Sequence, residues 1–155
     1  MLRYSRIAVA VLLLGAAAGQ AFAAEESKAD AAIKYRQSAM TLVKTYFGPL
    51  GAMSQDKLPF DKAKVEQYAG ILATLSTLPI DQYPAGSEKG DNQKTRAKAE
   101  IWTDGAKFKQ AHDKFAQETA RLAQVAKGND MKAIKAQIGA VGKTCKACHD
   151  DFKEK

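Results

Sequence analysis

The sequence predicts an all-α fold, an antiparallel up-down-up-down four-helix bundle that follows an N-terminal leader. Four segments place apolar residues at three-to-four spacing, the period of one helix face, and no segment shows convincing strand alternation. The connections between these segments are mostly short, so consecutive helices are expected to pack antiparallel. A chain of 155 residues fits a single domain of this kind.

The N-terminus has the pattern of a secretory signal peptide. Two arginines precede an apolar run over residues 7–18, and residues 21–23 form a small-x-small cleavage site. The apolar run is short for a bilayer span, although an uncleaved membrane anchor is the alternative. We therefore expect residues 1–23 to be a cleaved signal peptide and residues 24–155 to form the bundle. The mature protein is then expected to be periplasmic and free of the membrane.

The first helix is expected over Ser27–Phe47, with Ile33, Met40 and Val43 on one face. The pair Gly48-Pro49 then weakens or kinks the helix, because proline lacks a backbone N–H and crowds the preceding turn. Residues 54–59 are expected to form a loop.

The second helix is expected to begin at Asp61, whose carboxylate can accept hydrogen bonds from the free N–H groups of the first turn. Phe60 before this cap and Val65 after it match a hydrophobic staple, and Pro79 ends the helix. The next segment, Ile80–Lys94, contains one proline and two glycines and is expected to be a long loop. Loops of this length are often functional.

The third and fourth helices are expected over Arg96–Lys127 and Met131–Phe152. Gly128 closes the third helix, and Asp130 caps the fourth. The apolar positions of the fourth helix alternate in steps of four and three, which is the pattern of a bundle core. These positions are Ile134, Ile138, Val141, Cys145, Cys148 and Phe152.

The composition is mildly basic, with 24 Lys and Arg against 17 Asp and Glu. Loss of the two leader arginines lowers the formal net charge from +7 to +5. The basic residues are spread along the helices rather than gathered in a stripe with aromatic residues, which argues against a nucleic-acid partner. A mildly basic surface favours an acidic redox partner.

The two cysteines belong to the segment Cys145-Lys146-Ala147-Cys148-His149, the attachment pattern of c-type haem. Residues three and four apart share one helix face, so both cysteines can form thioethers with the vinyl groups of one porphyrin. His149 can then reach the iron. We predict one covalent haem c in the bundle near the C-terminal helix, with His149 as axial iron ligand.

A disulfide and a thiol–disulfide oxidoreductase are the alternatives for the cysteine pair. An oxidoreductase is expected to carry its cysteines at a helix N-terminus beside a βαβ pattern, whereas here they lie near the end of the last helix.

A sixth iron ligand would have to come from upstream, because only six residues follow His149. The candidates are Met40, Met53, Met131 and His112, or no residue at all. Met131 lies about 25 Å from the haem motif along a helix. His112 falls on an apolar face, where a buried histidine bonded to a neighbour is the ordinary interpretation and a bis-histidine haem is the alternative.

The sequence resembles cytochrome c′, the class II c-type cytochromes, over nearly the whole mature chain. The resemblance is carried by Tyr35–Met40, Leu75–Pro79, Glu100-Ile101-Trp102 and Cys145–His149 followed by Asp150. It implies a four-helix antiparallel bundle with the haem near the C-terminal helix. It also implies a five-coordinate, high-spin iron and a distal pocket closed by an apolar side chain of the first helix.

The resemblance further implies roles for three residues of the first helix. Met40 matches the distal position, where family members carry bulky apolar residues. Arg36 and Gln37 match positions beside the haem propionates, and a guanidinium–propionate pair would be a charge-assisted hydrogen bond.

Three further residues match haem-contacting positions of the family. Asp91 matches a loop position close to the haem edge, although the loop is longer here. Phe108 resembles a pocket-lining aromatic residue, with ordinary core packing as the alternative. Lys153 resembles a basic residue near the proximal face, with a solvated tail lysine as the alternative.

From this resemblance we expect a haem protein that is not an enzyme, that binds NO and CO in a crowded apolar pocket, and that has electron transfer as a further role. The alternative is a low-spin electron carrier with Met40 as sixth ligand. Members of the family are often homodimers through their first two helices, and the sequence does not decide the oligomeric state.

Overall fold

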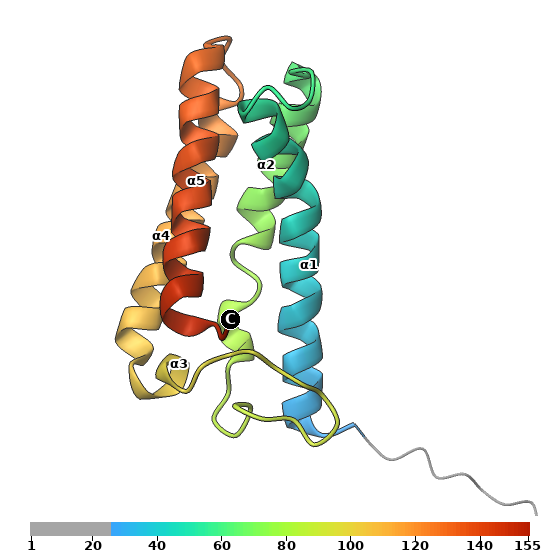
Figure 1. The fold of residues 1–155 in the computed structure, drawn as a ribbon, viewed down its shortest axis with the longest axis vertical. Helices are drawn as coiled ribbons and strands as arrows, with labels where there is room; N and C mark the ends of the chain where they lie inside the picture. Colours follow the sequence, from blue (N-terminus) through green and yellow to red (C-terminus); the bar gives the residue numbers. More distant parts are fainter. Residues whose placement is uncertain (1–25) are drawn as a thin grey trace, which may run out of the picture.

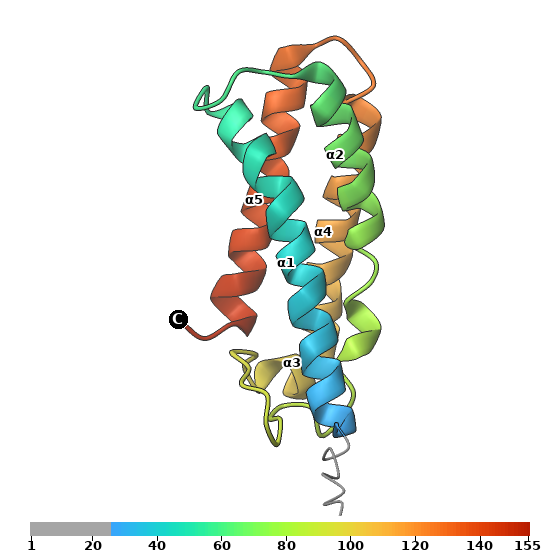
Figure 2. The same ribbon diagram turned by 90° about the vertical axis from the view of Figure 1, so that its right-hand side faces the viewer.

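The computed structural model describes residues 26–155, and the expected signal peptide lies outside them. Four long helices stand side by side and run alternately up and down, which confirms the predicted four-helix bundle (Figures 1 and 2). Each packs against two others, in the cyclic order α1, α2, α4, α5. No helix of the described residues is long and apolar enough to cross a membrane. The elements are α1 (Lys28–Ser54), α2 (Lys62–Leu75), η1 (Ile80–Gln82), α3 (Glu100–Thr103), α4 (Gly105–Val125) and α5 (Met131–Phe152).

Helix α1 is longer than the sequence indicates, since it continues through Pro49 to Ser54. Leu50 and Met53, beyond the proline, are buried in the main core, and this burial holds the last turns in helical conformation. The last turns lean away from the line of the first part, as expected for a helix that contains a proline (Figure 2).

The prediction of one continuous third helix from Arg96 was wrong. Helix α3 is a single turn, and the backbone breaks at Asp104, where φ is −128° and ψ is 54°. The Asp104 carboxylate accepts a hydrogen bond from the backbone N–H of Lys107 and so caps α4. Upstream, Ala97 forms an antiparallel bridge with Lys153 instead of continuing a helix. The start of the segment is therefore governed by pairing with the C-terminus.

The other predicted boundaries are close to those observed. Helix α5 has the predicted bounds, and its Asp130 cap accepts from the N–H of Ala133. Asp61 caps α2 as predicted, although α2 ends at Leu75, before Pro79.

The loop between α2 and α3 is tied to the beginning of α1 by one buried carboxylate. Asp30 accepts hydrogen bonds from the backbone N–H groups of Asn92 and Gln93 at 3.0 and 2.9 Å. Gly90 lies so close that an added Cβ would stand 2.2 Å from an Asp30 carboxylate oxygen. This anchoring sets the path of the loop across the end of the bundle.

The described residues form two apolar clusters. The larger one fills the bundle between the four long helices. The smaller one, built on Ile101, Phe108 and Phe152, lies where α3, α4 and the end of α5 meet. The space next to this smaller cluster is the candidate site.

Candidate haem-binding site

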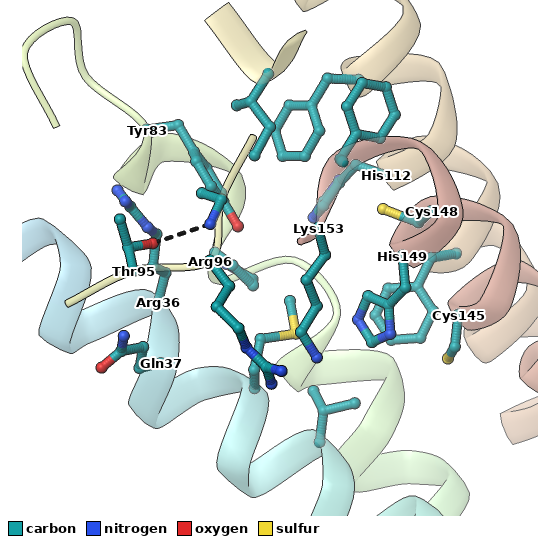
Figure 3. A pocket seen from close by; sticks show the side chains of 18 of the residues that line it. Arg36, Gln37, Tyr83, Thr95, Arg96, His112, Cys145, Cys148, His149 and Lys153 are labelled. Carbon is teal, nitrogen blue, oxygen red and sulfur yellow. Dashed lines mark hydrogen bonds between the residues drawn. The ribbon is translucent and has the colours of Figure 1, made fainter. Parts of the chain in front are cut away.

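A cavity of about 870 Å³ opens between α1, α4, α5 and the loop before α3. Figure 3 shows Arg36 and Gln37 of α1 on one side, the cysteines and His149 of α5 on the other, and Arg96 and Lys153 between them. Its lining combines apolar and aromatic side chains with a rim of basic ones. The volume lies within the range typical of cofactor pockets.

Cys145, Cys148 and His149 all line this cavity, as the sequence predicts for a haem attachment segment. Their spacing along α5 places them on neighbouring positions of one helix face. Both cysteine side chains are half-buried. Helix α5 therefore presents two thiols and an imidazole to one space.

The thiols lack the electrostatics of a thiol oxidoreductase. Burial raises the pKa of the Cys145 thiol, and burial together with the neighbouring Cys145 and Asp151 raises the pKa of Cys148 to about 11. Redox-active cysteines have lowered pKa values, typically at a helix N-terminus or beside a cation. The environment of these cysteines therefore argues against the oxidoreductase alternative.

The surroundings of His149 disfavour its protonated form. Burial lowers its pKa, and the nearby cations Lys153 and Arg96 lower it further. A neutral imidazole is the form that binds a metal. The electrostatic surroundings of His149 therefore suit the axial ligand role predicted for it.

The α1 wall carries the three predicted residues Arg36, Gln37 and Met40, and all three line the cavity. Arg36 is buried and donates to the Gln82 carbonyl at 3.1 Å and to the hydroxyl and carbonyl of Ser87 at 3.0 and 2.7 Å.

Both predicted polar residues, Arg36 and Gln37, thus donate hydrogen bonds to the loop. The Arg36 guanidinium lies over the rings of Tyr83 and Trp102, with its carbon 4.8 and 5.6 Å from their centroids. Gln37 donates its amide to the Lys94 carbonyl at 2.7 Å. Their predicted contacts with the haem propionates stay a prediction.

Phe108 belongs to the core and to the cavity wall at once. Its ring packs edge-on against Tyr83 and Phe152, with centroids 4.7 and 5.2 Å apart. The same side chain lines the cavity. The two interpretations of Phe108, core packing and pocket lining, therefore describe one position.

Two other predicted residues are placed differently. Lys153 lines the cavity, one helical turn beyond His149. Asp91 is exposed and does not line it, so its predicted place at the haem edge gains no support from the cavity.

The candidate sixth ligands differ in whether they line the cavity. Met40 and His112 line the cavity, whereas Met53 is buried in the main core and Met131 lies at the opposite end of α5. His112 is about nine-tenths buried, and its Nε2 has no hydrogen-bond partner within the described chain. Burial lowers the pKa of His112, while a backbone hydrogen bond with Ser76 opposes that shift. Only part of the expected neighbour bonding of His112 is thus present.

The rim of the cavity also contains residues that were not predicted from the sequence. Lys44, Lys94 and Arg96 line the cavity, and Tyr83 contributes to the aromatic wall. Two basic residues within three positions, in a segment that follows a long loop, were the available signal. The helix predicted from Arg96 onward gave no reason to expect this residue at a cavity rim, because the pairing of Ala97 with Lys153 is not visible in the local sequence.

The residues present fit a haem. A porphyrin needs an apolar slot, two thiols for its vinyl groups, an imidazole for its iron and cations for its two carboxylates. The cavity lining supplies each of these and contains no Asp or Glu. Within the described chain, no group of three or more His, Cys, Asp and Glu side chains is arranged to hold a metal ion by itself.

The chain matches known proteins over nearly all of these residues. The pattern of the family described as Cytochrome C' matches residues 31–153. The cytochrome c′ of Rubrivivax gelatinosus is 45% identical over 124 residues, which cover 80% of this chain and 95% of that protein. The cytochrome c′ of Alcaligenes xylosoxydans xylosoxydans is 38% identical over 129 residues, with 83% and 98% covered.

Solved structures agree with the sequence matches. Cytochrome c prime from Shewanella frigidimarina superposes with a TM-score of 0.78 at 43% identity, over 84% of this chain and 98% of that chain. A nitric oxide complex of a cytochrome c prime variant from Alcaligenes xylosoxidans gives a TM-score of 0.75 at 37% identity, over 84% and 99% of the two chains.

Proposed function

The chain belongs to the cytochrome c′ family, and on that premise we propose that it is a periplasmic haem protein whose five-coordinate, high-spin iron binds NO and CO. Its cofactor is one haem c, attached through thioethers to Cys145 and Cys148. The haem supplies an iron atom with which a diatomic gas can form a bond.

The observation that carries this proposal is the chemistry of the α1 wall. Of the apolar residues that α1 contributes to the cavity, Met40 follows Arg36 and Gln37 most closely along the helix, and its thioether has no hydrogen to donate. A pocket closed by such a side chain gives little stabilisation to polar bound oxygen, whereas NO and CO need less polar help. The nitric oxide complexes solved for a relative support the same ligand class.

A second candidate function is electron transfer by a low-spin haem. The favouring observation is again Met40, because a methionine that lines the haem cavity carries a thioether able to bind iron. The basic rim of the cavity suits an acidic redox partner. In either case we propose a carrier or binding role rather than catalysis. The proposal includes a homodimer, for which the family resemblance is the sole support.

The absorption spectrum of the purified holoprotein separates the two functions. A high-spin ferric spectrum that changes on addition of NO, and a ferrous spectrum that changes with CO, are expected. A low-spin ferric spectrum with a methionine–iron band would instead establish the electron carrier. Cell fractionation with haem staining tests the location, and haem protein confined to the cytoplasm would contradict the periplasmic assignment.

A further inference from the structure

We propose that Arg96 is a haem-binding residue whose guanidinium pairs with a propionate carboxylate at the mouth of the cavity. The family resemblance points only to Arg36 and Gln37 for this task. The inference concerns how the cofactor is held, so it stands apart from the choice between gas binding and electron transfer.

The charges of the side chains that line the cavity favour an anionic ligand. Among residues 26–155, five cationic side chains line the cavity and no carboxylate does. Salt bridges over the described surface are made by other lysines, and none involves these five. A covalently held haem places two carboxylates here, and a partly buried carboxylate is stable only when paired or hydrogen-bonded. The five residues are Arg36, Lys44, Lys94, Arg96 and Lys153.

Arg36 is already largely committed to the protein. Its guanidinium makes three hydrogen bonds to Gln82 and Ser87 and lies against two aromatic rings. No hydrogen bond or salt bridge occupies the guanidinium of Arg96 within the described residues, which leaves its planar fork available to meet both oxygens of one carboxylate. A lysine offers a single ammonium without this geometry.

The backbone of Arg96 is fixed in place, although its side chain reaches solvent. Its carbonyl accepts from the N–H of Glu154 at 2.8 Å, and the next residues are bridged to Phe152 and Lys153. At the other end of the segment, the Lys94 carbonyl accepts from Gln37 at 2.7 Å.

Residues 94–98 therefore form a strap across the cavity mouth, from α1 to the end of α5. The Arg96 side chain projects from this strap beside Lys153 and on the side of His149 (Figure 3). A side chain held on a fixed strap loses less freedom when it binds a carboxylate.

The test compares holoproteins carrying Arg96→Gln, Arg96→Lys and Lys98→Gln. Lys98 is the matched control, because it lies on the same strap, carries the same charge and does not line the cavity. Its ammonium donates instead to the Asp150 carbonyl at 3.0 Å. The readouts are the propionate bending band in the resonance Raman spectrum and the reduction potential.

Arg96→Gln is expected to shift the propionate band and to lower the reduction potential, because a nearby cation favours the less positive, ferrous state of the haem. Arg96→Lys keeps the charge and most of the potential, but shifts the band since the fork is lost. Lys98→Gln is expected to leave the band unchanged and to move the potential several-fold less. Thermal unfolding and haem absorbance verify that each variant is folded and loaded.

An unchanged propionate band in Arg96→Gln would overturn the proposal, even if the potential falls, because Arg96 would then act only as a distant charge. Equal effects of Arg96→Gln and Lys98→Gln would overturn it as well. A low-spin spectrum of the unmodified protein would refute the five-coordinate function and leave this test intact, since the propionate band reports on the haem edge.

Discussion

Replacing Met40 with alanine tests whether this side chain controls access of gases to the haem. Met40 is 36% exposed, so the protein covers about two thirds of its surface. Full burial of a methionine side chain is worth about 1.5–3 kcal/mol, and the covered part therefore about 1–2 kcal/mol. A ligand that must push Met40 out of these contacts bears this cost. Replacing the Met40 side chain by alanine removes this cost and is expected to speed CO and NO association about 5–30-fold.

The assay is stopped-flow or flash-photolysis measurement of CO binding to the ferrous holoprotein. Met131→Ala is the matched control, because Met131 is 49% exposed at the other end of α5 and does not line the cavity. Its association rate should equal that of the unmodified protein. The free energy of unfolding should fall by about 1–2 kcal/mol in Met40→Ala, less than the roughly 2–5 kcal/mol typical of a fully buried methionine.

Two results would refute this reasoning. If Met40→Ala binds CO no faster than Met131→Ala, the side chain does not lie on the path of the ligand. If the unmodified protein is low-spin and Met40→Ala turns high-spin with a large drop in reduction potential, Met40 is the sixth ligand and electron transfer is the function.

The other predictions concern haem attachment, the loop and the buried histidine. Replacing Cys145 and Cys148 with alanine should abolish the haem-stained band on a denaturing gel and leave a poorly folded chain; a well-folded, haem-free product at normal yield would contradict this. Gly90→Ala should lower the unfolding free energy by about 1–3 kcal/mol because the new Cβ meets the Asp30 carboxylate. A Cβ added at Gly139 would point into open space, so Gly139→Ala should not lower the unfolding free energy. Equal melting temperatures of Gly90→Ala and Gly139→Ala would contradict the predicted clash. His112→Gln should leave the haem spectrum nearly unchanged. Burial lowers the pKa of His112 below its ordinary 6.5, so the unfolded chain binds the proton more tightly and stability is lost as the pH falls through that value. Urea unfolding should show that the unfolding free energy falls less between about pH 7.5 and about pH 5 in His112→Gln than in the unmodified protein. The same pH dependence in both proteins would exclude this effect of His112.

Features governed by neighbours along the chain were predictable from the sequence. Helix α5 has its predicted bounds, because the Asp130 cap and the apolar steps of four and three both act within one helix. The haem attachment segment is equally local, since residues three and four apart share a helix face wherever the helix packs. The Asp61 cap of α2 follows the same rule.

Features that depend on distant contacts were decided only by the tertiary structure. Helix α1 passes through Pro49 because Leu50 and Met53 are buried against other helices.

The predicted helix start at Arg96 gave way to a strap, because Ala97 pairs with Lys153, more than fifty residues later. That pairing brings Arg96 to the cavity mouth, and the packing of α4 places His112 in the cavity wall, where its Nε2 has no hydrogen-bond partner among residues 26–155. No local pattern encodes either position, because each follows from where separate helices meet. Thus the local sequence identified the residues that are predicted to attach the haem, whereas tertiary packing decided which charges surround the cavity.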